Sequence, residues 1–224
     1  MRVIFLLLIF LGFGFSVSRA QNTTVEGADL GSQAIFDDRA LINGYTDKFA
    51  DEPKNVLLAM IADDSIGTYK CTAAIRVFKQ KYGGEILSTE KAGIIKILLR
   101  RLNRTDSPFV QVEIFHTLIV LDRYQYFESM MPALIQKLDH YNAVVRDLAY
   151  DDIQDIIKDD DRTREARIVF NTLRKIFFLT RNRLNNVVQP DEKLRQQLSI
   201  LRWAIKILGT QELVRLPSEV IRLL

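Results

Sequence analysis

Few side chains that could perform catalytic or metal chemistry occur in the 224 residues: two histidines, His116 and His140, and one cysteine, Cys71. A zinc site built on histidine or a Ser-His-Asp triad would need one of these two histidines. His116 falls in an apolar helical stretch, so we expect a buried ring satisfied by its neighbours, and His140 falls in a turn. Cys71 lies in mid-helix beside alanines and is predicted to be an inert interior thiol.

Carboxylates recur every four residues along one predicted helix and continue beyond its end, at Asp147, Asp151, Asp155 and Asp159 to Asp161. Calcium prefers such oxygens, but the turn has no glycine, and Phe170 stands where the closing Glu of an EF-hand would be. The pattern therefore favours a solvated acidic face, with a cation site as the alternative. Because like charges four apart destabilise a helix, it also predicts a basic group nearby.

The dipeptide Glu128-Ser129 matches the start of the pattern of lytic transglycosylases, all-α enzymes that cleave cell-wall glycan. The Gly-Leu-Met-Gln stretch that should follow is absent, and the next residues continue an amphipathic helix. A glycan-cleaving enzyme with Glu128 as its acid is therefore an alternative only. We predict no catalytic residue, no metal and no cofactor, because glycine-rich phosphate loops, paired cysteines and nucleotide fingerprints are also missing.

Basic residues concentrate in the last third of the chain, where residues 162–224 hold 13 bases and 5 acids, against 2 bases and 8 acids in residues 139–161. Within the predicted helix 163–184, the apolar side chains gather on one side. Arg167, Arg174 and Arg181 lie seven apart on the other side, with Phe178 among them. An aromatic side chain among arginines indicates a partner-binding face. The alternative is that these arginines are solvated or paired with Asp147, Asp151 and Asp155.

The first twenty residues have the order of a secretory signal peptide: a positive start at Arg2, an apolar run over residues 3–15, and a small polar end. Ser18 and Ala20 are the small residues that a signal peptidase requires, so we expect cleavage between Ala20 and Gln21. The apolar run is shorter than the ~20 residues that cross a bilayer, which disfavours an uncleaved anchor. The mature chain should be exported without stable membrane insertion, to the periplasm or outside in a bacterium and into the secretory pathway in a eukaryote.

Composition excludes several classes of protein. With 48% hydrophobic residues, 10 Gly and 5 Pro, the chain suits a globular fold and neither a disordered nor a collagen-like one. The formal charge of +3 includes Arg2 and Arg19 of the signal peptide, so their removal leaves +1. A near-neutral exported chain is not expected to bind nucleic acid.

The spacing of apolar residues is helical almost everywhere after residue 33, which predicts an all-α fold. Residues 21–32 are predicted to be a flexible leader, and residues 33–224 a single helical domain of about four helix pairs with a C-terminal capping helix. Breaks at Gly, Pro and Asp clusters place the expected helices at 34–50, 54–62, 66–82, 89–103, 108–122, 125–139, 142–157, 163–184, 190–208 and 211–223.

Three of these helices share one pattern: Tyr69, Lys70, Ala73, Val77; Val110, Gln111, Ile114, Leu118; and Val145, Arg146, Ala149, Ile153. Over residues 54 to about 208 the chain resembles the HEAT and armadillo helical repeats. The resemblance implies a right-handed superhelical stack of antiparallel helix pairs, with an irregular helical bundle as the alternative. Gln111 stands where the family has Arg, and Asp152 takes a core-side position where it has a small apolar residue.

These observations together predict an exported, non-enzymatic helical-repeat protein that serves as an interaction or scaffold module. Stacked repeats contact only their neighbours and leave a long surface free, which suits the binding of another protein or an anionic envelope component. A self-associating structural protein is a further alternative.

Overall fold

The computed structural model describes residues 37–224, and the predicted signal peptide, its Ala20–Gln21 cleavage site and the leader lie outside them. The described residues are all-α, as predicted, and contain no strand. Their helices are α1 (Asp38–Phe49), α2 (Lys54–Ala62), α3 (Thr68–Tyr82), α4 (Ser88–Leu102), α5 (Pro108–Leu121), α6 (Arg123–Lys137), α7 (Ala143–Ile157), α8 (Thr163–Leu184), α9 (Glu192–Leu208), the 3₁₀ helix η2 (Thr210–Arg215) and α10 (Ser218–Ile221).

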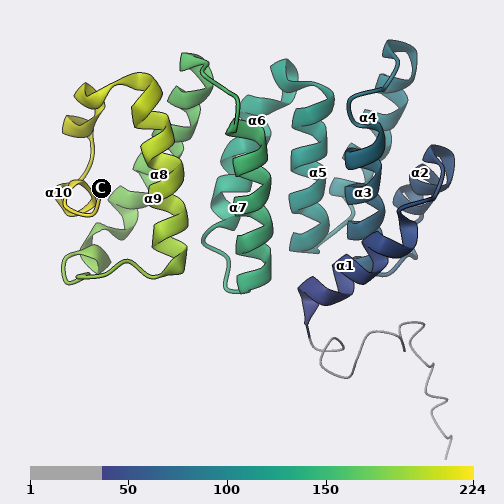
Figure 1. Cartoon of the computed structure of the whole chain (residues 1–224), viewed down its shortest axis with the longest axis horizontal. Coiled ribbons are helices and arrows are strands. Elements are labelled where there is room, and N and C mark those ends of the chain that lie inside the picture. The colour runs from purple at the N-terminus through teal and green to yellow at the C-terminus, as the bar shows by residue number, and fades with distance from the viewer. Residues whose placement is uncertain (1–36) are drawn as a thin grey trace, which may run out of the picture.

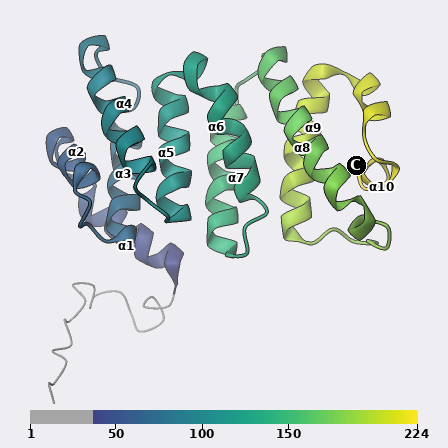
Figure 2. The same cartoon turned by 180° about the vertical axis from the view of Figure 1, so that it is seen from behind.

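The helices stack side by side in two layers. Helices α1, α3, α5, α7 and α9 form the layer that faces the viewer in Figure 1, and α2, α4, α6 and α8 form the layer seen from behind in Figure 2. Within the stack, α2 packs on α3, α4 on α5, α6 on α7 and α8 on α9. Within residues 37–224, no helix is long and apolar enough to cross a membrane.

Short polar side chains and prolines set the helix starts. Asp37 accepts hydrogen bonds from the backbone N–H groups of Arg39 and Ala40 and caps α1 at Asp38, while residues 34–36 of the predicted helix lie outside the described residues. Asn142 caps α7 in the same way. Pro108 occupies the first turn of α5, where its missing N–H leaves no hydrogen bond unmade.

The C-terminal prediction was wrong, because no single helix covers residues 211–223. Gly209, at φ 99°, ends α9 in a backbone conformation that favours glycine. Helix η2 then stops at Leu216, which is extended (φ −96°, ψ 155°) because the ring of Pro217 disfavours a helical residue before it. Only the short α10 follows.

The three helices that share a sequence pattern are consecutive neighbours in one layer. Of their matched apolar residues Tyr69 is partly buried, and the others are buried: Ala73, Val77, Val110, Ile114, Leu118, Val145, Ala149 and Ile153. The polar position also has a shared role in two of them. Gln111 donates to the carbonyl of Thr105, and Arg146 donates to the carbonyls of His140 and Tyr141. Each side chain therefore ties its helix to the turn that precedes it.

Ala149 is fully buried in α7, in contact with the core. We expect Ala149→Leu to destabilise the fold by about 1 to 3 kcal/mol, because a larger side chain forces shifts in a close-packed interior. Urea denaturation measures the change. Val144→Leu, at a partly buried position of the same helix, is the control and should change stability by less. An unchanged free energy of unfolding in Ala149→Leu would contradict the close contact.

Candidate functional site

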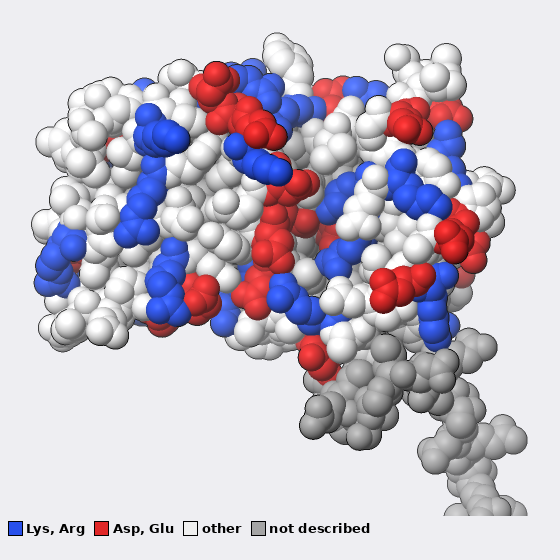
Figure 3. Space-filling view, viewed as in Figure 1, with Lys and Arg blue, Asp and Glu red and all other residues white. Residues whose placement is uncertain are grey.

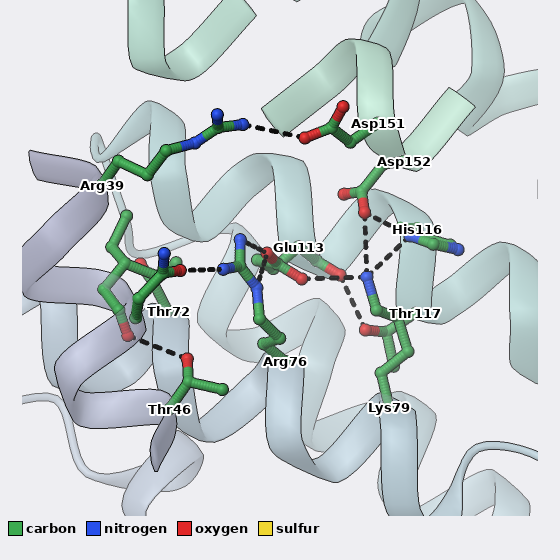
Figure 4. Close-up of polar contacts among 12 residues, drawn as sticks. Arg39, Thr46, Thr72, Arg76, Lys79, Glu113, His116, Thr117, Asp151 and Asp152 are labelled. Carbon is green, nitrogen blue, oxygen red and sulfur yellow. Dashed lines mark hydrogen bonds and ion pairs between the residues drawn. The ribbon is translucent and has the colours of Figure 1, made fainter. Parts of the chain in front are cut away.

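A network of charged side chains joins α3, α5 and α7 inside the layer that faces the viewer in Figure 1. At its centre is Glu113, which is fully buried. One of its oxygens accepts from Arg76 Nε at 2.8 Å and Nη2 at 2.6 Å, and the other pairs with Lys79 Nζ at 3.0 Å. Figure 4 shows these contacts between the helices. A buried carboxylate is thus matched by two cations, as its desolvation requires.

The network continues to α7 through His116 and Asp152. Lys79 Nζ lies 3.0 Å from Asp152 Oδ1, and His116 Nδ1 lies 2.6 Å from both groups. Nδ1 serves one of these contacts at a time: without a proton it accepts from Lys79, and with a proton, in the neutral Nδ1–H tautomer or in the imidazolium, it donates to Asp152. On the other side of the ring, Nε2 is 3.1 Å from Asp155 Oδ2 but makes no aligned hydrogen bond.

The charges in this network determine whether the pKa of each group is raised or lowered from its ordinary value. Burial opposes the charged forms of Lys79, His116 and Asp152, but in all three groups hydrogen bonds and opposite charges outweigh the effect of burial on the pKa. The carboxylates of Glu113 and Asp152 raise the pKa of Lys79, and the hydrogen bond with Asp152 together with the nearby Asp155 carboxylate raises that of His116. Lys79 and His116 in turn lower the pKa of Asp152. The network therefore favours protonated Lys79 and His116 beside an ionised Asp152.

A hollow of about 510 Å³ opens beside the network; it is lined by Arg39, Asn43, Arg76, Lys79, Gln80, His116, Leu148, Asp151, Asp152 and Asp155, and we call it the charged hollow. In Figure 3, acidic side chains form a column down the middle of this face, where Figure 1 places α7, and basic side chains lie on both sides. The side chains of Asp151 and Asp155 are 62% and 70% exposed, so the column reaches solvent.

The predicted basic partners of the acidic stripe exist. From the basic C-terminal third, Arg162 pairs with Asp160 at 3.0 Å, whereas the aspartates within α7 have other partners. Asp151 pairs with Arg39 of α1 at 2.9 Å, and Asp155 lies beside His116. Asp147 accepts from Gln196 of α9 at 2.9 Å. Pairing of the α8 arginines with Asp147, Asp151 and Asp155 is therefore wrong, and solvated arginines stay as the alternative to a binding face.

The predicted partner-binding residues lie on the outward side of α8, and we call this surface the α8 face. As expected, the opposite side of α8 is buried, with Ala166, Val169, Phe170, Leu173, Phe177 and Leu184 in the core. Phe178 is 41% exposed, and the Arg174 guanidinium carbon lies 5.6 Å from the centre of its ring. Arg181 is exposed and makes no ion pair or hydrogen bond with any described residue.

Arg167 has a different environment from the other α8 arginines. Its Nη1 is 2.5 Å from Glu212 of η2, which also pairs with Arg215 at 2.8 Å. This clamp holds the chain after α9 against α8. The structure thus brings Arg174, Phe178 and Arg181 together on the α8 face and gives Arg167 a partner within the chain.

Other residues considered from the sequence have ordinary surroundings. Glu128 is exposed and pairs with Arg164 at 2.8 Å, unlike the buried apolar setting of a carboxylic acid that donates protons. Cys71 is buried, which raises the pKa of its thiol. His140 stacks on Tyr141 in the turn before α7. No group of three His, Cys, Asp or Glu side chains in the described part of the chain could hold a metal ion.

The charge network was not predicted from the sequence, although two of its members, His116 and Asp152, were singled out. His116 was expected to be a satisfied interior residue, and Asp152 was noted as a departure from the repeat pattern. The signal lies in pairing across helices: Arg76 with Glu113, Lys79 with His116, and His116 with Asp152 are each 36 or 37 residues apart. A search for oppositely charged or hydrogen-bonding residues 36 or 37 positions apart on neighbouring predicted helices would have revealed the network.

Comparisons with known proteins identify no relative: no family model, no curated protein and no solved structure matches the chain.

Proposed function

We propose that this chain is an exported, non-enzymatic helical-repeat scaffold of the HEAT type, and that its α8 face binds another protein. The stacked helices and the shared pattern of α3, α5 and α7 support the repeat assignment. Export rests on the signal-peptide pattern of residues 1–20. A hollow of about 330 Å³ lies beside Glu128, as the glycan-cleaving alternative would require, but the Glu128 side chain is 68% exposed and ion-paired with Arg164, unlike an acid that donates protons.

The observation that carries the binding proposal is a hollow of about 670 Å³ on the α8 face, lined by Asn171, Arg174, Lys175, Phe178, Leu179 and Arg215. Leu179 is 86% exposed beside the half-exposed ring of Phe178. Exposed apolar groups rimmed by cations are typical of docking sites, since the cations steer the partner and the aromatic ring anchors it. A partner that presents carboxylates around an apolar side chain fits this chemistry.

The test is capture of partners by the immobilised chain beginning at Gln21, compared with its Arg174→Glu/Arg181→Glu variant. We expect the variant to lose captured protein at least tenfold, because two charges that attract the partner become repulsive. Its melting temperature should fall by no more than about 2–4 °C, since neither arginine has an ion-pair partner in the described part of the chain.

The matched control is Lys96→Glu/Lys206→Glu, which makes the same charge change at exposed positions on α4 and α9. It should retain capture. Equal capture by all three proteins would refute the α8 face as the site. Binding of the wild type to anionic lipid vesicles, with no protein captured, would point instead to an anionic envelope component. Capture of the chain's own copies alone would favour self-association.

A further inference from the structure

One carboxylate oxygen at the bottom of the charged hollow has no partner. Asp152 is only 8% exposed, and its Oδ1 is shared by Lys79 and His116. Its Oδ2 is buried and makes no hydrogen bond within the described residues. In Figure 4 this oxygen points away from His116, toward the side where Arg39 and Asp151 lie. A buried acceptor without a donor is costly, so a ligand that supplies donors is favoured there.

The cations around the hollow are already committed. Arg76 is held by both Glu113 and Asn43, and Lys79 lies between Glu113 and Asp152. An anionic ligand would have to compete with these carboxylates. A cationic donor would complete the coordination of Asp152 and meet Asp151 and Asp155 at the rim.

The rim already binds a guanidinium group. Arg39 Nη2 of α1 pairs with Asp151 Oδ2 at 2.9 Å, and both side chains are about half exposed. Exposed ion pairs contribute little to folding stability, so the guanidinium of a ligand can replace that of Arg39 beside Asp151 at a small cost in free energy. The planar group carries five N–H donors, which suits several carboxylates at once better than a compact ammonium does.

We propose that the charged hollow is a binding site for an arginine side chain of a basic peptide segment, with Asp152 Oδ2 at the bottom and Asp151 and Asp155 at the rim. The volume of about 510 Å³ leaves room for such a side chain, far beyond the roughly 30 Å³ of one water. The site lies on the opposite layer from the α8 face and is independent of it.

The test is an NMR titration of the chain beginning at Gln21 with N-acetyl-arginine methylamide, a probe that mimics one residue of a peptide. We expect saturable shifts of α7 amides and of the His116 ring. The citrulline analogue has the same shape without the charge and should cause no saturable shift. Equal binding of citrulline, or no shift with arginine, would overturn the proposal. Binding of free arginine without binding of the blocked form would overturn the peptide assignment.

Three variants keep the proposal testable even where Asp152 itself is needed for folding. Asp151→Asn/Asp155→Asn should weaken binding at least tenfold, because it removes both rim charges. Arg39→Ala should tighten binding, because it frees Asp151 from its internal competitor. Asp159→Asn/Asp161→Asn removes the same charge from exposed positions after α7 and should leave the affinity within about twofold. Equal weakening in this control would show attraction to overall charge alone and would refute the site.

Discussion

Replacing Lys79 with methionine should destabilise the fold by about 3 to 5 kcal/mol, because it leaves buried carboxylates without their cation. Glu113 keeps Arg76 as a partner, so most of the loss falls on Asp152, which retains only His116. Small domains have unfolding free energies of about 5–15 kcal/mol. The expected loss is therefore between about a fifth and all of the unfolding free energy. Urea denaturation of both proteins at pH 7 measures the difference.

The control is Lys54→Met, which removes a similar ion pair with Glu90 that is partly exposed to solvent. It should cost no more than about 1 kcal/mol. A second change, Asp152→Leu in the Lys79→Met background, should restore part of the lost stability, because the buried charge is removed together with its partner. Equal losses in Lys79→Met and Lys54→Met would show that the network contributes no more than a surface pair.

The pH dependence of the same network has a definite sign. The pKa of Asp152 is lowered in the folded chain, so its contribution is present above the unfolded value of about 3.9 and is lost as pH falls through the folded value. The pKa of His116 is raised, so its contribution is present below about 6.5 and is lost as pH rises through the folded value. In Lys79→Met, Asp152 keeps only His116 as a cationic partner and protonates more easily, so the loss of stability in this variant should shrink as the pH is lowered.

The helices were predictable because their signals are local. Pro108 opens α5, and the glycine at 209 ends α9, within the reach of a few residues. The periodicity of α8 correctly assigned its buried and outward sides. The C-terminal segment was missed because its helical periodicity was given more weight than Pro217, whose ring blocks the helix at Leu216.

The charge network could not be predicted in the same way, because its partners come from three helices. Within α5, Glu113 and His116 are polar residues in an otherwise apolar helix, and nothing in that helix satisfies their side chains. Only the packing of α3 and α7 on α5 supplies Lys79 and Asp152. The α8 face differs, since Arg174 and Phe178 are four residues apart on one helix and their proximity follows from its geometry.

Arg123→Met should give the other large effect, a loss of about 3 to 5 kcal/mol, because this arginine joins three helices at once. From the start of α6 it donates to Glu165 of α8 at 2.8 and 2.5 Å, to the carbonyl of Ile156 in α7 at 3.0 Å, and to Asp160. The Asp160 side chain is only 2% exposed. Burial alone would raise the pKa of Asp160, but hydrogen bonds from the backbone and side chain of Arg162 and the charge of Arg123 lower it to about 2.

Arg164→Met is the matched control. It removes an arginine from the same junction, but the ion pair of Arg164 with Glu128 is largely exposed. It should lower the unfolding free energy far less than Arg123→Met does. Arg123→Lys should fall between wild type and Arg123→Met, because an ammonium keeps the charge but cannot span Glu165, Asp160 and the Ile156 carbonyl together. In wild type, the contribution of Asp160 should disappear as pH falls from about 3.9 to about 2. If Arg123→Lys were as unstable as Arg123→Met, the geometry of the guanidinium rather than its charge would account for the whole effect. If Arg123→Met were as stable as Arg164→Met, the stability of the junction would not depend on Arg123.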